Sequence, residues 1–137
     1  MHIITGKYKN QKIKTADTIF SPTFVVRNAL FNILGEKIFH AAILDLFAGD
    51  GILSIEALSR GAKSAVINNS IKKNFVITKQ NVEKICKDER ILFTKDDAKS
   101  IKLSFFNKID IIFCNSFNQE INITHDIIQN KKSKQEA

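Results

Sequence analysis

The residues best suited to chemistry in this sequence lie in one short segment, Asp45-Leu-Phe-Ala-Gly49-Asp-Gly51. The segment follows an apolar run of strand length and precedes a helical pattern, and open α/β sheets bind ligands at such turns. Glycines allow the backbone to approach a ligand closely and to adopt positive φ angles. A carboxylate ahead of the glycines would repel a pyrophosphate but suits a cationic group, such as the ammonium of S-adenosylmethionine (SAM). The segment therefore predicts a SAM site.

Two other interpretations of this segment stay open. In the first, Asp45 only ends a strand beside a packing turn. In the second, the turn belongs to a dinucleotide-binding oxidoreductase. The sequence disfavours the second, because Ser54 stands where the dinucleotide fingerprint has its third glycine. The following strand also ends at Asn68, which lacks the negative charge of a ribose-holding acid.

Strands and helices alternate around this segment. Strands are expected at residues 42–47, 64–68, 90–94 and 109–114. Helices are expected at residues 52–60, from a Ser70 cap to Ile85, as a short turn at 98–103, and within 120–130. Strands that are apolar throughout and separated by helices predict an α/β fold, with a parallel sheet covered on both faces.

A hairpin and a helix are expected to precede this unit. Residues 1–14 predict two short strands around Asn10-Gln11. The apolar anchors of the hairpin are Ile3, Tyr8 and Ile13. Ser21-Pro22 predicts the start of the helix, because serine accepts hydrogen bonds from free N–H groups and proline suits the first turn. Gly35 is the expected end of the helix.

Length and composition indicate one globular domain. The chain has 137 residues, of which 44% are apolar and 26% are charged, as is ordinary for a folded protein. No apolar run approaches the roughly 18 residues of a membrane span, and no signal peptide is evident. The two cysteines lack metal-ligand spacing, so no metal site is predicted. The expectation is a cytoplasmic protein.

Positive charge is concentrated near the N-terminus. The net charge of the chain is +7, and residues 1–40 hold six basic and two acidic side chains. Four of the lysines fall between Lys7 and Lys14. A preference of the whole chain for lysine explains the choice of lysine over arginine but not this clustering. A basic cluster favours a polyanion as partner.

Several of these segments resemble one enzyme family. DLFAGDGILSIEALSRGA, residues 45–62, resembles motif I of the bacterial 16S rRNA guanine-N2 methyltransferases of the RsmD type. MHIITGKYKNQKIK and SPTFVVRNALFNIL resemble the basic hairpin and the helix that open those proteins. The resemblance covers roughly residues 1–114. It implies a Rossmann-like SAM-dependent methyltransferase fold, here with its C-terminal strands missing, that methylates the N2 amine of a guanine in 16S rRNA.

The resemblance also implies which residues contact SAM. The acid and glycines of motif I would contact the methionine part, which assigns Asp45, Phe47, Ala48, Gly49 and Gly51 to the cofactor. Asn68 occupies the position of the family's ribose-holding acid. Asp97-Ala98 matches the pair that meets the adenine, and an exposed turn acid before a helix is an equally good interpretation of Asp97.

The implied catalytic loop departs from the family. The family ends its fourth strand with Asp/Asn-Pro-Pro-Tyr/Phe, where this chain has Asn115-Ser116-Phe117-Asn118. Asn115 keeps an acceptor for the guanine amine, Ser116 would supply the backbone carbonyl, and Phe117 either stacks on the base or is simply buried. Two hypotheses follow. The chain is an active methyltransferase, or it is an inactive or truncated remnant that binds RNA or SAM without transferring methyl groups.

The same reasoning predicts an organisation and partners. Residues 1–40 would be an RNA-contacting extension, residues 41–130 a shortened SAM-binding core, and residues 131–137 a disordered tail. The phosphates of 16S rRNA, in the small-subunit particle, would be contacted by Lys7, Lys9, Lys12, Lys14 and Arg27. No membrane partner is expected. The chain would be a monomer, or a dimer across the sheet edge left open after the fourth strand.

Overall fold

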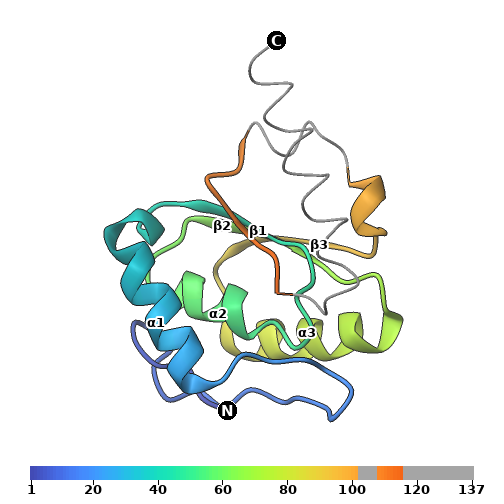
Figure 1. Ribbon diagram of the computed structural model, residues 1–137, viewed down its shortest axis with the longest axis horizontal. Helices are drawn as coiled ribbons and strands as arrows, with labels where there is room; N and C mark the ends of the chain where they lie inside the picture. Colours follow the sequence, from blue (N-terminus) through green and yellow to red (C-terminus); the bar gives the residue numbers. More distant parts are fainter. Residues whose placement is uncertain (102–107, 116–137) are drawn as a thin grey trace.

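A four-stranded parallel sheet forms the centre of the protein (Figure 1), for which we describe a computed structural model over residues 1–101 and 108–115. The strands lie in the order β3-β2-β1-β4. Their bounds are β1 Ala42–Asp45, β2 Ser64–Asn68, β3 Arg90–Thr94 and β4 Ile111–Phe113. The prediction of an α/β fold with a parallel sheet is confirmed, and β1 and β4 are shorter than their apolar runs.

In β1, β2 and β4, neighbouring residues pack in two different cores. Ile43 of β1 packs in the larger core, together with Ala65 of β2 and Phe113 of β4. Leu44, the next residue of β1, belongs to the smaller core on the opposite face. This separation follows from the strand geometry, because successive side chains point to opposite faces of a sheet.

The larger core lies under three helices, α1 Phe24–Leu34, α2 Ile52–Ser59 and α3 Lys72–Ile85, which all lie on one side of the sheet (Figure 1). On the other face, the cover within the described residues comes from the short 3-10 helix η2 Ala98–Ser100 and from Ile101. A second 3-10 helix, η1 Gly35–Ile38, follows α1 directly. The expectation of helical cover is therefore confirmed on one face of the sheet.

The N-terminal hairpin is present, but its strands are reduced to one bridge. His2 and Lys12 pair antiparallel. The Ile3 N–H donates to the Gln11 carbonyl at 3.0 Å, and the Asn10 N–H donates to the Ile3 carbonyl at 2.8 Å. The hairpin rests on α2, because the carboxylate of Glu56 accepts hydrogen bonds from the backbone of residues 4 and 5. It is thereby fixed to the same helix that begins after the glycine turn.

Two predicted helix caps are wrong. Thr23, not Ser21, caps α1, and its hydroxyl accepts a hydrogen bond from the Val26 N–H at 3.3 Å. Ser21 and Pro22 lie in the non-helical segment before the helix, which begins only at Phe24. Ile71, not Ser70, precedes α3, and no side chain caps that helix. Gly35 does end α1, with φ at 51°, and the helix predicted within 120–130 lies outside the described residues.

Among residues 1–101 and 108–115, no helix combines the length and the apolar character that crossing a membrane requires.

Candidate functional site

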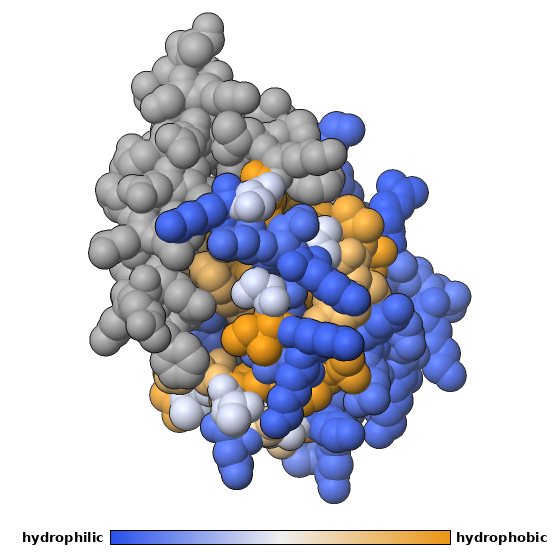
Figure 2. Space-filling model, turned by 90° about the vertical axis from the view of Figure 1, so that its right-hand side faces the viewer, coloured by the Kyte–Doolittle hydropathy of each residue, from blue (hydrophilic) through white to orange (hydrophobic). Residues whose placement is uncertain are grey.

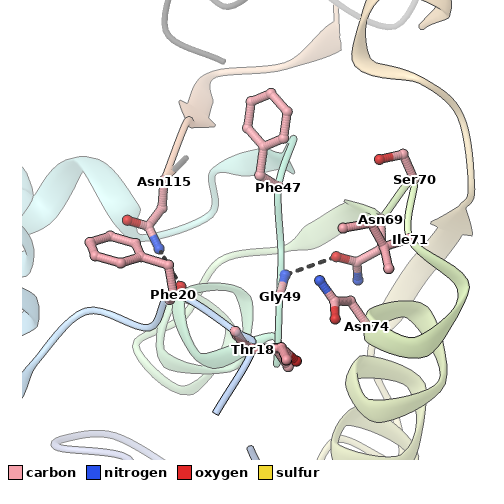
Figure 3. A pocket seen from close by; sticks show the side chains of 10 residues that line it. Thr18, Phe20, Phe47, Gly49, Asn69, Ser70, Ile71, Asn74 and Asn115 are labelled. Atoms are coloured by element: carbon pink, nitrogen blue, oxygen red, sulfur yellow. Dashed lines mark hydrogen bonds between the residues drawn. The ribbon is translucent and has the colours of Figure 1, made fainter. Parts of the chain in front are cut away.

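A pocket lies at the carboxyl edge of the sheet, lined by residues that follow β1, β2 and β4 and by residues 18–20 (Figure 3). After β1 the chain proceeds to β2 on one side, whereas β4 pairs with β1 on the other. Parallel sheets bind ligands where the strand order reverses in this way. Its lining residues include Phe20, Phe47, Gly49, Asn69, Asn74 and Asn115.

Two polar side chains form hydrogen bonds with the backbone of the glycine turn and stabilise its conformation. The Gly49 N–H donates to Asn69 Oδ1 at 2.8 Å, and the Thr78 hydroxyl donates to the Gly49 carbonyl at 2.7 Å. Asn69 also donates to Thr78 through Nδ2 at 2.9 Å. These bonds use both the N–H and the carbonyl of Gly49. The turn therefore accommodates a ligand through its shape and not through hydrogen bonds from Gly49.

Both glycines of the turn are required by their conformation. Gly49 has φ at +66° and Gly51 has φ at +87°, which side chains with a Cβ rarely adopt. A Cβ on Gly49 would also lie 2.9 Å from Cγ2 of Ile19. The segment 18–20 therefore packs directly onto the turn, and together they form one wall of the pocket.

Asp45 is a buried acid with one unsatisfied oxygen. It is 1% exposed, and its Oδ2 accepts a hydrogen bond from the Ser54 hydroxyl at 2.6 Å. Its Oδ1 has no hydrogen-bond partner within residues 1–101 and 108–115. Burial raises the pKa of Asp45 to about 7, although the bond from Ser54 works against the rise. Asp45 does not itself line the pocket, whereas Phe47 and Gly49, which follow it, do.

Asn68 links the ends of three strands. Its Nδ2 donates to the Leu46 carbonyl at 3.1 Å and to the Asp96 carbonyl at 2.9 Å. Its Oδ1 accepts from the Thr94 hydroxyl at 2.7 Å and from the Asp96 N–H at 3.0 Å. A carboxamide has two donors and two acceptor sites. All four are used within the protein, and a contact of Asn68 with a ribose stays a prediction.

Asp97 and Ala98 follow β3 at the same edge of the sheet. The Asp97 carboxylate accepts a hydrogen bond from the Lys99 N–H at 3.1 Å and so caps η2. Ala98 is buried against Leu44 and Leu46. This geometry is that of an exposed turn acid before a helical turn. A contact of either residue with adenine stays a prediction.

Asn115 and Phe20 meet across the pocket from segments far apart in the sequence. Asn115 follows β4, and its Nδ2 donates to the Phe20 carbonyl at 3.3 Å (Figure 3). The structure thus places Asn115, Phe47 and Gly49 around one pocket. Ser116 and Phe117 lie outside the described residues. Sequence reasoning missed Phe20, because its neighbours carry no recognisable motif.

The basic residues of the N-terminal segment divide into two groups. Lys7, Lys9, Lys12 and Lys14 are exposed, and Lys7 pairs with Glu89 at 2.8 Å. Arg27, by contrast, is 2% exposed and donates to the His2 carbonyl at 2.8 Å. Burial lowers the pKa of Arg27. This burial does not favour a contact between Arg27 and an RNA phosphate, and that contact stays a prediction.

Hydrophilic side chains are not confined to the N-terminal segment. Figure 2 shows a face on which they predominate, with apolar side chains scattered between them. Exposed lysines on α3 include Lys72 and Lys79, and Lys95 lies over the ring of Phe75 at 4.4 Å. The role of the hairpin lysines in RNA binding is therefore argued from their clustering and stays a prediction.

Comparison with known proteins points to one family. The sequence profile described as "Conserved hypothetical protein 95" matches residues 1–136. The chain is 30% identical over 136 residues to the ribosomal RNA small subunit methyltransferase D of Buchnera aphidicola subsp. Acyrthosiphon pisum, over 96% of this chain and 71% of that protein. It is 48% identical over 77 residues to an uncharacterised methylase of Rickettsia prowazekii, over 49% of this chain and 33% of that protein.

A solved protein structure is also similar to this chain. An Escherichia coli protein named as a candidate methyltransferase superposes with a TM-score of 0.65 at 32% identity, over 73% of this chain and 54% of that chain. The described residues share the Rossmann-like fold of that protein. The matched part spans one third of the Rickettsia relative and about half of the E. coli chain.

Proposed function

Because the chain belongs to the RsmD-type family of ribosomal RNA small subunit methyltransferases, we propose that it methylates the exocyclic N2 amine of a guanine in 16S rRNA, with SAM as methyl donor. The observation that carries the proposal is the pocket in which Asn115, after β4, lies across from the glycine turn after β1. An acceptor for an amine and a turn shaped for a close ligand thus share one pocket.

The residues at the end of β1 fit a cationic ligand. A buried carboxylate oxygen without a partner, Oδ1 of Asp45, favours an ammonium over a phosphate. Gly49 and Gly51 allow the rest of the ligand to approach the backbone, and Phe47 and Ala48 continue the same turn. When bound, SAM supplies a methyl group on a sulfonium, which is open to direct displacement. We propose Asp97 and Ala98 as its adenine contacts.

Asn115 is the residue that we assign to the amine. The N2 lone pair of guanine delocalises into the ring, which makes the amine a poor nucleophile. A carboxamide oxygen that accepts a hydrogen bond from the amine holds the lone pair toward the methyl donor. Nδ2 of Asn115 is held by Phe20, which directs Oδ1 as the acceptor. Ser116 and Phe117 complete the proposed loop.

The proposal extends to partners and location. The exposed lysines of the hairpin would contact rRNA phosphates through charge without reading sequence. Residues 1–40 would form that extension, residues 41–130 the SAM-binding core and residues 131–137 a tail. We propose a cytoplasmic protein that acts on the small-subunit particle as a monomer or as a dimer across the sheet edge.

SAM affinity is expected to depend on pH because of Asp45. Its pKa is about 7, and only the carboxylate form attracts an ammonium. The dissociation constant should therefore rise by roughly tenfold for each pH unit below 7. The ligand's own amine loses its proton near pH 8, so calorimetric titrations between pH 5.5 and 7.5 are the measurement. An affinity independent of pH in this range would exclude Asp45 as the partner of the ammonium.

Substitution of Asn115 tests the proposed reaction. Asn115→Ala should lower methyl transfer from radiolabelled SAM to immature small-subunit particles by about tenfold or more, because one oriented hydrogen bond is lost. SAM affinity should stay unchanged. Asn32→Ala, an exposed asparagine on α1, is the matched control. A wild-type chain that binds SAM but transfers no methyl group would support the second hypothesis, binding without catalysis.

A further inference from the structure

Phe20 presents a large aromatic ring at the pocket although nothing in the reaction described above uses it. The side chain is 53% exposed and lines the pocket with Phe47 and Asn115. Figure 3 places its ring next to the Asn115 carboxamide. Phe47 differs, because its ring packs against the smaller core of the sheet. Of the two aromatic rings among the described lining residues, the more exposed one therefore lies beside the proposed catalytic asparagine.

The backbone that carries Phe20 is firmly fixed. Asn81 of α3 donates to the Lys14 carbonyl at 2.8 Å and accepts from the Lys14 N–H at 3.0 Å. The Thr15 hydroxyl donates to the buried carboxylate of Asp50 at 2.8 Å. The carbonyl of Phe20 itself accepts from Asn115. A segment held at both ends fixes the backbone position from which the ring projects, as a binding platform requires.

We propose that Phe20 is the platform on which the target base stacks, with its amine at Asn115. This inference rests on the proposed function and names a substrate-positioning residue for it. A base that undergoes methylation must leave its stack, and proteins receive such bases on aromatic faces. The pocket side chains considered above are uncharged, so a flat purine fits it better than a phosphate does. Hydrogen bonding at Asn115 and stacking at Phe20 would act on the edge and the face of one base.

Three variants separate this role from general packing. Phe20→Ala removes the ring, and Phe20→Tyr restores an aromatic face. Phe24→Ala is the matched control, since Phe24 is 57% exposed but lines a different surface, near Met1 and Arg27. Thermal unfolding of each variant establishes that it is folded.

The probe is a single-stranded RNA that carries one 2-aminopurine, a fluorescent base with the same exocyclic amine. Stacking quenches its fluorescence. Phe20→Ala should relieve the quenching and weaken kcat/KM for methyl transfer by about 10- to 100-fold, with SAM affinity unchanged. Phe20→Tyr and Phe24→Ala should stay within about threefold of wild type, which is the scatter of neutral surface changes.

Three results would overturn the inference. The first is a Phe20→Ala variant with the fluorescence quenching and kcat/KM of wild type. The second is a Phe24→Ala variant that changes both as much as Phe20→Ala does. The third is a loss of SAM affinity in Phe20→Ala, which would mean that the ring contacts the cofactor. A wild-type chain without methyl transfer would contradict the proposed function alone. The fluorescence comparison would still decide whether Phe20 receives a base.

Discussion

Asp45→Asn should weaken SAM binding by about 30-fold to 5000-fold, which corresponds to about 2–5 kcal/mol for truncating one partner of a buried charge pair. Asparagine keeps the acceptor for the Ser54 hydroxyl, which lies 2.6 Å from the carboxylate, but it carries no charge for an ammonium. Calorimetric titration with SAM at pH 7.5 measures the effect. An unchanged affinity would place the cationic end of the ligand elsewhere.

The same substitution should not destabilise the folded protein at neutral pH. The pKa of Asp45 is raised from 3.8 to about 7 by burial, so the folded state holds its proton more tightly than the unfolded state. The contribution of Asp45 to the free energy of unfolding is therefore greatest below pH 4. It falls as the pH rises from about 4 to about 7, and it stays constant above that. The loss amounts to at most about 4 kcal/mol.

Asp45→Asn lacks this titration. Its melting temperature should match that of wild type at pH 4 and exceed it at pH 8, as thermal unfolding followed by circular dichroism would measure. Loss of SAM binding in a more stable protein would show that the charge serves the ligand and not the fold. A variant that melts earlier than wild type at pH 8 would contradict the assignment of an unpaired buried charge.

Glu56→Ala should lower the free energy of unfolding by about 3–5 kcal/mol, as expected for removal of one member of a buried ion network. Glu56 is fully buried. Its carboxylate accepts from the Arg60 Nε at 2.9 Å and lies 3.6 Å from Arg27 Nη1. It also accepts from the Ile4 N–H at 2.8 Å. The variant leaves cations and a backbone donor without their partner.

Urea unfolding measures the global effect of Glu56→Ala, and hydrogen exchange at residues 3–13 measures its local part. Both should change, because the hairpin is tied to α2 through this carboxylate. The matched control is Glu83→Ala on α3, whose side chain is 63% exposed and lies 3.9 Å from Lys79. It should change stability by less than about 1 kcal/mol. Equal effects of the two substitutions would contradict the role of the buried network.

Much of the framework could be predicted from the sequence, for local reasons. The strands Ser64–Asn68 and Arg90–Thr94 have the bounds that their apolar runs predict, because turn residues limit each run on both sides. The glycine turn was predictable because positive φ angles demand glycine at Gly49 and Gly51. Each of these features is encoded within a few consecutive residues.

The contacts that complete the site are not local. The bond between Asn115 and Phe20 joins residues 95 positions apart, and no periodicity reports on such a pair. Ser54 was considered only as a missing glycine, whereas its hydroxyl holds Asp45. Asn68 and Arg27 were assigned by type, and residue type does not tell whether a side chain's hydrogen-bonding groups face solvent or are already used.

The location of the pocket walls in the sequence bears on when the site can form during synthesis. One wall comes from residues 18–20, and another comes from Asn115 after β4. The β4 strand pairs with β1 through Ile43 and Ile111, across both intervening helix–strand units. A chain that emerges residue by residue can form the hairpin, α1 and the first strands early. The pocket closes only after β4 has left the ribosome, so a partly synthesised chain cannot bind a base in it.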